Sequence, residues 1–330
     1  MICKKTKKEA VEEINYLTNK GLPYFFVADF EGDNFLIISG NEVFNGKDLF
    51  FDFGGVTNYR RELKAKIRIV NIQPPTFEEY CKAFEQVKRQ ISYGNTYLLN
   101  LTFASEIQFD TSCYNLEKIF LAAKSKYKVW LPDKFVCFSP ETFVKINSYG
   151  MISTYPMKGT ADARLPDALH KLLKNEKEIS EHFTIVDLLR NDLAQVANYV
   201  KVKRFRYYEK IISSRGELWQ TSSEIVGKLK PDFIKNYGNV LSEMLPAGSI
   251  SGAPKKKTVE IIKSVEPVSR GFYTGIAGFF NGEELDTTVL IRFIEKKNNR
   301  FFYRSGGGIV FKSVAKKEYE ELIKKIYLPV

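Results

Sequence analysis

The chain has 330 residues, 44% of them hydrophobic and 14% aromatic, so it can bury a large core and is not an intrinsically disordered protein. No stretch approaches the roughly 18 apolar residues that span a bilayer, and the N-terminus lacks the apolar segment of a signal peptide, so we expect a cytoplasmic protein. The net charge of +11 comes from basic residues scattered among glutamates, which argues against nucleic-acid and membrane partners and suits a small anionic substrate.

The sequence indicates one continuous domain with reduced thiols. Cys3, Cys81, Cys113 and Cys137 are too few and too scattered for a disulfide framework, and they lack metal-binding spacing. No repeat, low-complexity tract or polar linker divides the chain. We therefore expect a single, two-lobed domain.

The predicted elements mix strands and helices without a regular alternation. Residues 1–75 are predicted as strands that end at Pro74-Pro75, and Thr76 with Glu79 forms a capping box for a helix to about residue 90. The later elements are strands between 94 and 144 with a short helix near 114–125, a helix over 180–197, a strand at 201–212, a helix at 255–265, strands at 273–280, 287–294 and 301–303, and a helix at 314–326. This order predicts an α+β fold of antiparallel strands with helices outside.

The helix over residues 180–197 is predicted from an apolar stripe at helical spacing. The stripe consists of Phe183, Val186, Leu189, Leu193 and Val196. Such a stripe is expected to face the core.

Two predicted helices each carry two carboxylates three residues apart. Glu178 and Glu181 lie at the start of one, and Glu318 and Glu321 lie near the C-terminus. Residues i and i+3 share a helix face, so each pair can point into one cavity, and oxygen donors without histidine or thiolate suit Mg²⁺. The alternative is a solvated surface, with Lys325 in a simple i,i+4 salt bridge to Glu321.

Two glycine-rich segments could bring backbone amides to an anionic ligand. Residues 248–257, GSISGAPKKK, place a turn before Pro254, which suits the first position of a helix. Three glycines at 306–308 follow strand residues and would allow close backbone approach. The alternatives are a plain helix cap for the first segment and a β-bulge or tight turn for the second.

Lys158 stands in a predicted strand-to-turn segment, residues 151–160, beside apolar residues and before a glycine. A desolvated lysine loses its proton more readily and can act as a nucleophile, whereas a lone turn lysine is usually surface. Residue patterns alone thus indicate an α+β enzyme that depends on a metal and takes an anionic substrate.

Seven segments follow the order seen in the chorismate-utilising enzymes, and the chain resembles that family over residues 76–330. The segments are SPE (139–141), PMKGT (156–160), EHFTIVDLLRNDL (181–193), GSISGAPK (248–255), RGFYTGIAGFF (270–280), RSGGGIV (304–310) and EYEELIKK (318–325). Residues 1–75 resemble a shortened form of the family's N-terminal region. The resemblance implies stacked antiparallel sheets with flanking helices, in which residues 1–75 pack on the catalytic domain of residues 76–330.

The resemblance also implies roles for the motif residues. Glu181 and Glu321 correspond to Mg²⁺ ligands, with Glu178 and Glu318 as neighbouring carboxylates. The positions that match those holding the two carboxylates of chorismate are Tyr273, Arg292, Gly306, Gly307, Gly308 and Lys325, while Ser249 lies in the ligand-facing turn. Glu141 corresponds to the general acid that protonates the departing ring hydroxyl.

The residue before Gly-Thr in PMKGT separates the family's activities. It is typically Lys in aminodeoxychorismate synthases and Ala in anthranilate, isochorismate and salicylate synthases, and here it is Lys158. The implied mechanism has neutral Lys158 attack C2 of chorismate while the 4-hydroxyl leaves with a proton from Glu141, after which ammonia attacks C4 and expels the lysine. The resemblance thus implies component I of 4-amino-4-deoxychorismate synthase.

Two positions depart from the family pattern. Leu98 stands where aminating members commonly carry Gln, and Gln220, a candidate ring contact, stands where most carry His. A histidine matters most for pyruvate elimination, so Gln220 disfavours the main rival, anthranilate synthase component I. A second rival is a catalytically silent homologue that acts as a basic binding module.

We infer the expected partner proteins from enzyme segments that are not visible in the sequence. No glutamine-amidotransferase segment and no pyridoxal-phosphate lyase segment is visible, so ammonia is expected from a separate glutamine amidotransferase subunit or from solution. A separate lyase would then complete 4-aminobenzoate for folate synthesis.

Overall fold

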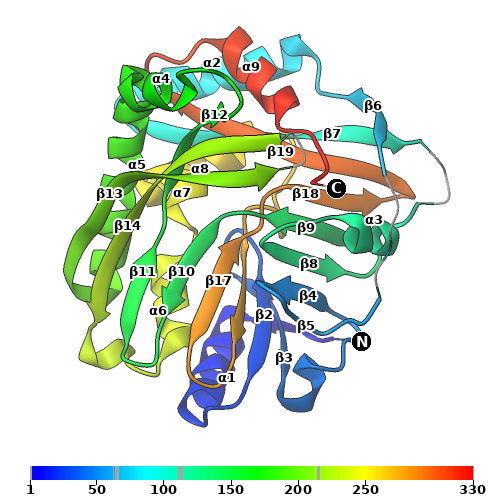
Figure 1. Cartoon of the computed structure of the whole chain (residues 1–330), viewed down its shortest axis with the longest axis vertical. Coiled ribbons are helices and arrows are strands. Elements are labelled where there is room, and N and C mark those ends of the chain that lie inside the picture. The colour runs from blue at the N-terminus through cyan, green and yellow to red at the C-terminus, as the bar shows by residue number, and fades with distance from the viewer. Residues whose placement is uncertain (1, 62, 64–66, 111–113, 214–215, 330) are drawn as a thin grey trace.

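The computed structural model describes residues 2–61, 63, 67–110, 114–213 and 216–329. Two large antiparallel sheets lie face to face over part of their width, and helices cover their outer sides (Figure 1). Cys113 lies outside the described residues, whereas Cys3, Cys81 and Cys137 are free thiols. The predicted α+β class is confirmed.

The first sheet contains ten strands of the described chain. Their spatial order is β1 (Lys4–Thr6), β3 (Asn34–Ser39), β2 (Tyr24–Ala28), β16 (Ile276–Phe280), β17 (Leu285–Val289), β10 (Thr142–Ile146), β11 (Met151–Thr154), β14 (Gly216–Leu229) and β12 (Met157–Asp162), with β13 (Ala197–Ser213) also paired to β14. Strand β14 therefore carries β12 and β13 on its two sides.

The second sheet contains nine strands of the described chain. Their order is β15 (Gly252–Ala253), β7 (Leu98–Phe109), β19 (Arg300–Val310), β18 (Phe293–Lys297), β9 (Phe135–Ser139), β8 (Tyr127–Leu131), β4 (Phe50–Phe53) and β5 (Val56–Thr57), with β6 (Ile69–Gln73) also paired to β7. Strands from the first 75 residues enter both sheets, and the predicted division at residue 75 stays a prediction.

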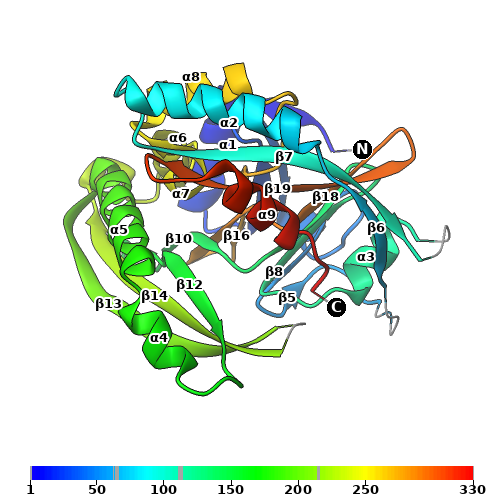
Figure 2. The same ribbon diagram turned by 90° about the horizontal axis from the view of Figure 1, so that it is seen from above.

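Helices flank the two sheets (Figure 2). They are α1 (Lys7–Asn19), α2 (Phe77–Ser92), α3 (Leu116–Ala122), α4 (Ala168–Lys174), α5 (Glu176–Val196), α6 (Tyr237–Met244), α7 (Gly248–Ser251), α8 (Lys255–Val265) and α9 (Ala315–Lys324), with 3-10 turns η1 (Gly40–Val43) and η2 (Pro231–Phe233). Within the described ranges, none of them has both the length and the apolar character needed to cross a bilayer.

Helix α1 corrects the prediction that residues 1–75 form strands only. A capping box between Thr6 and Glu9 starts the helix. Ala10, Ile14 and Leu17 then recur on one buried face. The apolar face is narrow, and charged residues separate its members along the sequence. The helical spacing of the apolar residues was therefore not recognised from the sequence.

The strand predicted at 287–294 is wrong as one element, because the chain leaves the first sheet after β17 and enters the second at β18, with Arg292 at a φ of 54° between them. The remaining predicted elements are confirmed with shifted ends. Helix α2 begins after the predicted Thr76–Glu79 capping box, and α8 has the predicted bounds. The predicted stripe of α5 is buried except for Phe183, which is 56% exposed. Its neighbour His182 is buried instead, because α5 packs against the twisted β13–β14 pair through that face. The three glycines at 306–308 lie within strand β19 and not in a turn.

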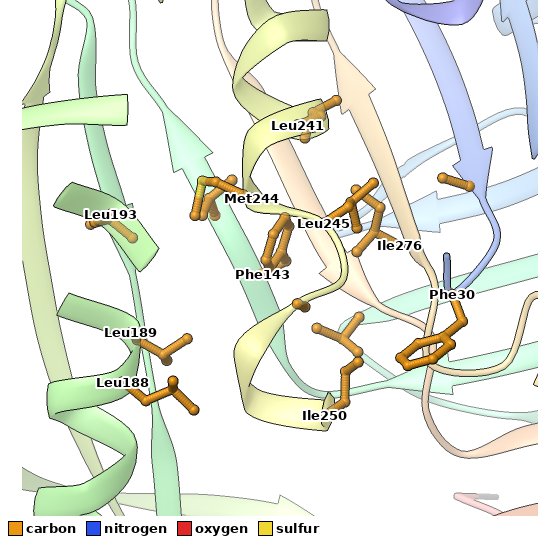
Figure 3. Packing of buried hydrophobic residues seen from close by; sticks show 14 of the residues in the cluster. Phe30, Phe143, Leu188, Leu189, Leu193, Leu241, Met244, Leu245, Ile250 and Ile276 are labelled. Carbon is orange, nitrogen blue, oxygen red and sulfur yellow. The ribbon is translucent and has the colours of Figure 1, made fainter. Parts of the chain in front are cut away.

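The largest apolar core joins the first sheet to the helices around α5 and α6. In Figure 3 the leucines of α5 face Met244 and Phe143, while Leu245 and Ile250 lie on the segment that runs from α6 into α7. A second cluster fills the space between the sheets, where Phe25 stacks on Phe51 with ring centroids 4.2 Å apart. The short helix α7 is thus held inside the principal core.

A buried ion pair connects the end of α8 to the second sheet. Arg270 and Glu266 form a bidentate pair with nitrogen–oxygen distances of 2.9 and 2.7 Å, and their side chains are only 2% and 3% exposed. Glu266 also accepts hydrogen bonds from the backbone and hydroxyl of Thr102 in β7. Arg270 donates to the carbonyls of Asn100 and Ile250, which joins β7 to α7.

We predict that Arg270→Leu lowers the free energy of unfolding by about 3–5 kcal/mol, because Glu266 would be left buried without its counter-charge. Urea titration followed by circular dichroism measures the loss. The exposed Asp187–Arg190 pair of α5 is the control, and Arg190→Leu should cost less than about 1 kcal/mol. Equal losses in the two variants would contradict the importance of the buried pair.

Candidate functional site

A cavity of about 460 Å³ lies between α5 and β12 on one side and β19 with the end of α9 on the other. The turn at α7 and the segments before β10 and β18 close it. The predicted site residues that line it are Glu141, Lys158, Glu181, Ser249, Tyr273, Arg292, Gly306, Gly307, Gly308 and Lys325. Residues far apart in sequence are therefore brought to one place.

Glu141 lies between β9 and β10 and points its carboxyl group toward the α7 turn. Ser249 donates a hydrogen bond to its Oε1 at 2.7 Å. The Glu141 backbone carbonyl accepts from the Thr288 hydroxyl at 2.6 Å, which fixes the segment to β17. Burial raises the pKa of Glu141, against the opposing effects of the Ser249 hydrogen bond and nearby positive charges. A carboxyl group with a raised pKa can hold a proton for transfer.

Lys158 reaches the cavity from β12, opposite α5. Its Nζ lies 3.8 Å from Oε2 of Glu181, and its carbonyl accepts a hydrogen bond from the Thr221 hydroxyl of β14. Gly159 follows with φ of +81°, and a Cβ there would come within 2.9 Å of Leu172 and 3.0 Å of Glu178 Oε2. The positive φ therefore favours glycine after the lysine, and a larger residue would also displace the ends of the Leu172 and Glu178 side chains.

The four predicted metal-binding carboxylates occur as two pairs. Glu178 and Glu181 lie on α5, and Glu318 and Glu321 lie on α9, where one oxygen of each lies 3.7 Å from the place of a Cβ on Gly307. Among the described residues, no group of three or more His, Cys, Asp or Glu side chains is placed so that it could hold a metal ion. The donors are all carboxylate oxygens, whose chemistry suits a hard cation such as Mg²⁺.

Positive charge gathers at the β19 side of the cavity. Lys325 Nζ lies 2.8 Å from Glu321 Oε1 and donates to the carbonyl of Gly306 at 2.7 Å. Arg292 adopts a φ of 54°, and its Nε donates to the Tyr327 hydroxyl at 3.2 Å. The enclosed position of Lys325 lowers its pKa, because the charged amine is poorly solvated there. This corner suits a carboxylate ligand.

Tyr273 and the glycines complete that corner. Burial raises the pKa of Tyr273 to about 12, so its hydroxyl keeps its proton and can donate. A Cβ on Gly306 would lie 2.3 Å from the Leu101 carbonyl of β7, so no larger residue fits without moving the strand. Strand β19 therefore presents bare backbone to the cavity.

Gln220 and Leu98 have different positions relative to the cavity. Gln220 pairs with Thr160 across β14 and β12, and it is not among the described residues that line the cavity. Leu98 does line it, and its Cδ1 lies 3.1 Å from the place of a Cβ on Gly308. Leu98, which departs from the family pattern, therefore forms part of the cavity wall.

Sequence reasoning missed two buried polar residues near the site. Arg304 is 1% exposed, lines the cavity, lies 3.2 Å from Glu295 and stands over the Tyr273 ring. His182 on α5 is completely buried, with its Nε2 2.7 Å from the Ser223 hydroxyl, and burial lowers its pKa to about 4. Two features of the sequence could have indicated these residues. One is an arginine among inward-facing strand residues, and the other is a histidine directly after Glu181.

Comparisons with known proteins agree on one family. The family model for chorismate binding enzymes matches residues 56–329. An "uncharacterized PabA-like protein" of Haemophilus influenzae is 46% identical over the whole chain and 99% of its own length. Component 1 of aminodeoxychorismate synthase from Bacillus subtilis is 33% identical over 81% of this chain and 58% of its own length. Component 1 of anthranilate synthase from Acetivibrio thermocellus is 32% identical over 75% of this chain.

The fold comparison points the same way. The menaquinone-specific isochorismate synthase MenF of Escherichia coli superimposes with a TM-score of 0.75 at 16% identity, over 98% of this chain and 82% of MenF. At this identity the likeness concerns the fold alone. The chain spans a little more than half the length of the two synthases named above, covering 58% of one and 51% of the other. On the family match, which covers most of its length, the chain belongs to the chorismate binding enzymes.

Proposed function

We propose that this protein is component I of aminodeoxychorismate synthase and converts chorismate and ammonia to 4-amino-4-deoxychorismate. The observation that carries the proposal is the presence of Lys158 in the same cavity as Glu141, with Ser249 bonded to that carboxyl. A nucleophile, a proton donor and a cationic corner for carboxylates are then available to one ligand.

The residues divide the reaction between them. Arg292, Lys325 and the backbone of β19 hold the two carboxylates of chorismate. The Lys158 amine attacks C2, the two conjugated ring double bonds shift, and the bond from C4 to its hydroxyl breaks, so that the hydroxyl leaves as water with the proton of Glu141. Ammonia then forms a bond to C4, the two double bonds shift back and the C2–Lys158 bond breaks. Two displacements through the lysine thus place nitrogen at C4.

The two carboxylate pairs would hold Mg²⁺ in this proposal. Glu181 and Glu321 are the ligands, with Glu178 and Glu318 beside them, and the bound cation would neutralise a carboxylate of the substrate. Glu181 interacts with Lys158 in the present structure. One of the carboxylates that would hold the cation thus also contacts the proposed nucleophile.

The nearest alternative is anthranilate synthase component I, which a 32% identical relative supports. Lys158 argues against it, because the family resemblance associates lysine before Gly-Thr with aminodeoxychorismate synthases and alanine with anthranilate synthases. A silent binding module is a weaker alternative, since the acid, the nucleophile and the cations converge on one cavity. We further propose that a glutamine amidotransferase subunit supplies ammonia and that a separate pyridoxal-phosphate lyase completes 4-aminobenzoate.

The direct test is product analysis. Purified protein with chorismate, ammonium salt and Mg²⁺ should form the 4-amino product, identified by mass and ultraviolet spectra. Glutamine in place of ammonium should give no product until an amidotransferase subunit is added. Formation of anthranilate by the wild type would assign the chain to the rival activity.

Lys158→Ala tests the nucleophile. The variant should bind chorismate nearly as well as the wild type, because the carboxylate contacts lie at β19 and α9, but its kcat should fall by about 10²-fold or more. Some 2-amino isomer is expected, since ammonia can enter beside C2. Steady-state kinetics and chromatography measure both effects, and a wild-type rate with 4-amino product alone would refute the assignment.

Glu181→Gln and Glu321→Gln test the metal. An amide is a neutral, weaker ligand for a hard dication, so each variant should lose most activity and bind Mg²⁺ more weakly in calorimetry without substrate. Glu320→Gln on the exposed side of α9 is the control. Unchanged Mg²⁺ binding in both site variants would exclude these carboxylates as ligands.

A further inference from the structure

The turn that carries Ser249 is anchored by a buried carboxylate of another helix. Asp192 of α5 is 3% exposed, and its Oδ2 accepts a hydrogen bond from the Gly248 backbone N–H at 3.1 Å. Its other oxygen lies 2.9 Å from Lys255 Nζ, at the start of α8. Lys255 also donates to the Met244 carbonyl at the end of α6, at 2.9 Å. One carboxylate thus joins α5, α7 and α8.

Close packing makes this contact specific. A Cβ on Gly248 would lie 2.5 Å from Asp192 Oδ2 and 3.2 Å from Leu188, so only glycine lets α7 approach the carboxylate. Burying an aspartate is costly unless it is paired and fully hydrogen-bonded, and Asp192 meets both conditions. If the Asp192–Lys255 ion pair had no role in the site, apolar residues could replace it at this depth.

The far end of α7 is fixed independently. The Ile250 carbonyl accepts hydrogen bonds from Arg270 at 2.9 Å and from Asn100 at 3.1 Å, and the Ser251 hydroxyl donates to the Ala247 carbonyl. Figure 3 shows Ile250 on this turn, below the segment that descends from α6. Ser249 stands between the two anchors, so its direction is set by both.

We propose that Asp192 is a positioning residue that holds α7 so that the Ser249 hydroxyl meets the Glu141 carboxyl. The proposal rests on the proposed function, in which Glu141 is the general acid. Asp192 touches neither the substrate nor the reacting atoms, and it acts only through the Gly248–Ser249 backbone. Burial raises the pKa of Glu141, and the Ser249 hydrogen bond opposes this rise because it stabilises the ionised carboxylate.

The charged groups that face Glu141 come from three other elements. They are Lys158 of β12, Arg292 before β18 and Lys325 at the end of α9, and each favours the ionised carboxylate. Removing the Ser249 bond leaves these charges in place but raises the pKa of Glu141 further. Because the acid must be protonated to act, the decline of activity with rising pH then moves to higher pH.

The test compares Asp192→Asn, Ser249→Ala and the double variant. We expect Ser249→Ala to move the alkaline decline of kcat upward by about one pH unit. Asp192→Asn should shift it in the same direction and lower kcat about tenfold, with KM for chorismate within about twofold of wild type. The double variant should show no further shift beyond Ser249→Ala. Additive shifts, or a wild-type pH profile in Asp192→Asn, would overturn the proposal.

Two further variants keep the result decisive. Asp187→Asn on the exposed face of α5 is the matched control and should leave the profile unchanged. If Asp192→Asn does not fold, Gly248→Ala replaces it as the test. The added Cβ should collide with Asp192 and move α7, while the Asp192–Lys255 pair remains. This variant should give the same shift of the pH profile. An unshifted profile in Gly248→Ala would then reject the positioning role.

A readout without turnover separates this inference from the proposed function. Infrared titration can follow the Glu141 carboxyl band, assigned by its loss in Glu141→Gln, in the protein without substrate. Its midpoint should rise in Ser249→Ala and Asp192→Asn but not in Asp187→Asn. An inactive wild type with these midpoints would refute the proposed function alone, whereas unchanged midpoints would refute the positioning role alone.

Discussion

The buried pair of Arg270 and Glu266 is the interaction on which the site's geometry depends. It connects the residues after α8 to strand β7 through Thr102 and to α7 through Ile250. A charge pair at this depth contributes little net free energy compared with apolar packing, but the loss of one partner is severe. The main effect of the Arg270–Glu266 pair is therefore to specify one arrangement of these elements. Its contribution to the overall stability of the fold is smaller.

This arrangement matters because the cavity has no single supporting element. Lys158 and Glu181 belong to the first sheet and its helix, whereas the glycines and Lys325 belong to the second sheet and α9. The α7 turn lies between these groups and is bonded to both, through Asp192 on one side and Arg270 on the other. Relative movement of the two halves would separate the lysine from the glycines and Lys325, and the bonded turn limits that movement.

The sequence predicted the fold class, most elements and many of the residues that line the cavity. Those predictions rested on local signals, such as the Thr76 capping box, or on ordered motifs such as PMKGT. Helix α1 was missed because charged residues interrupt its narrow apolar face. The roles of Arg304, His182 and Asp192 depend on contacts between residues far apart in the chain, which no local pattern records. The same limit explains why Gln220 was expected beside the ligand and lies outside the cavity lining.

The glycines of β19 give the cavity a floor made of main chain. The Leu101 carbonyl of β7 leaves no room for a side chain at Gly306, and Leu98 crowds Gly308, so this surface keeps its main-chain character. Under the proposed function, a floor of this kind would bind the carboxylates that all such ligands share. Differences in reaction outcome would then come from the opposite walls, on α5 and β12. Related enzymes could therefore diverge in product through a few wall residues while the floor stays the same, and product identity would be easier to change than substrate identity.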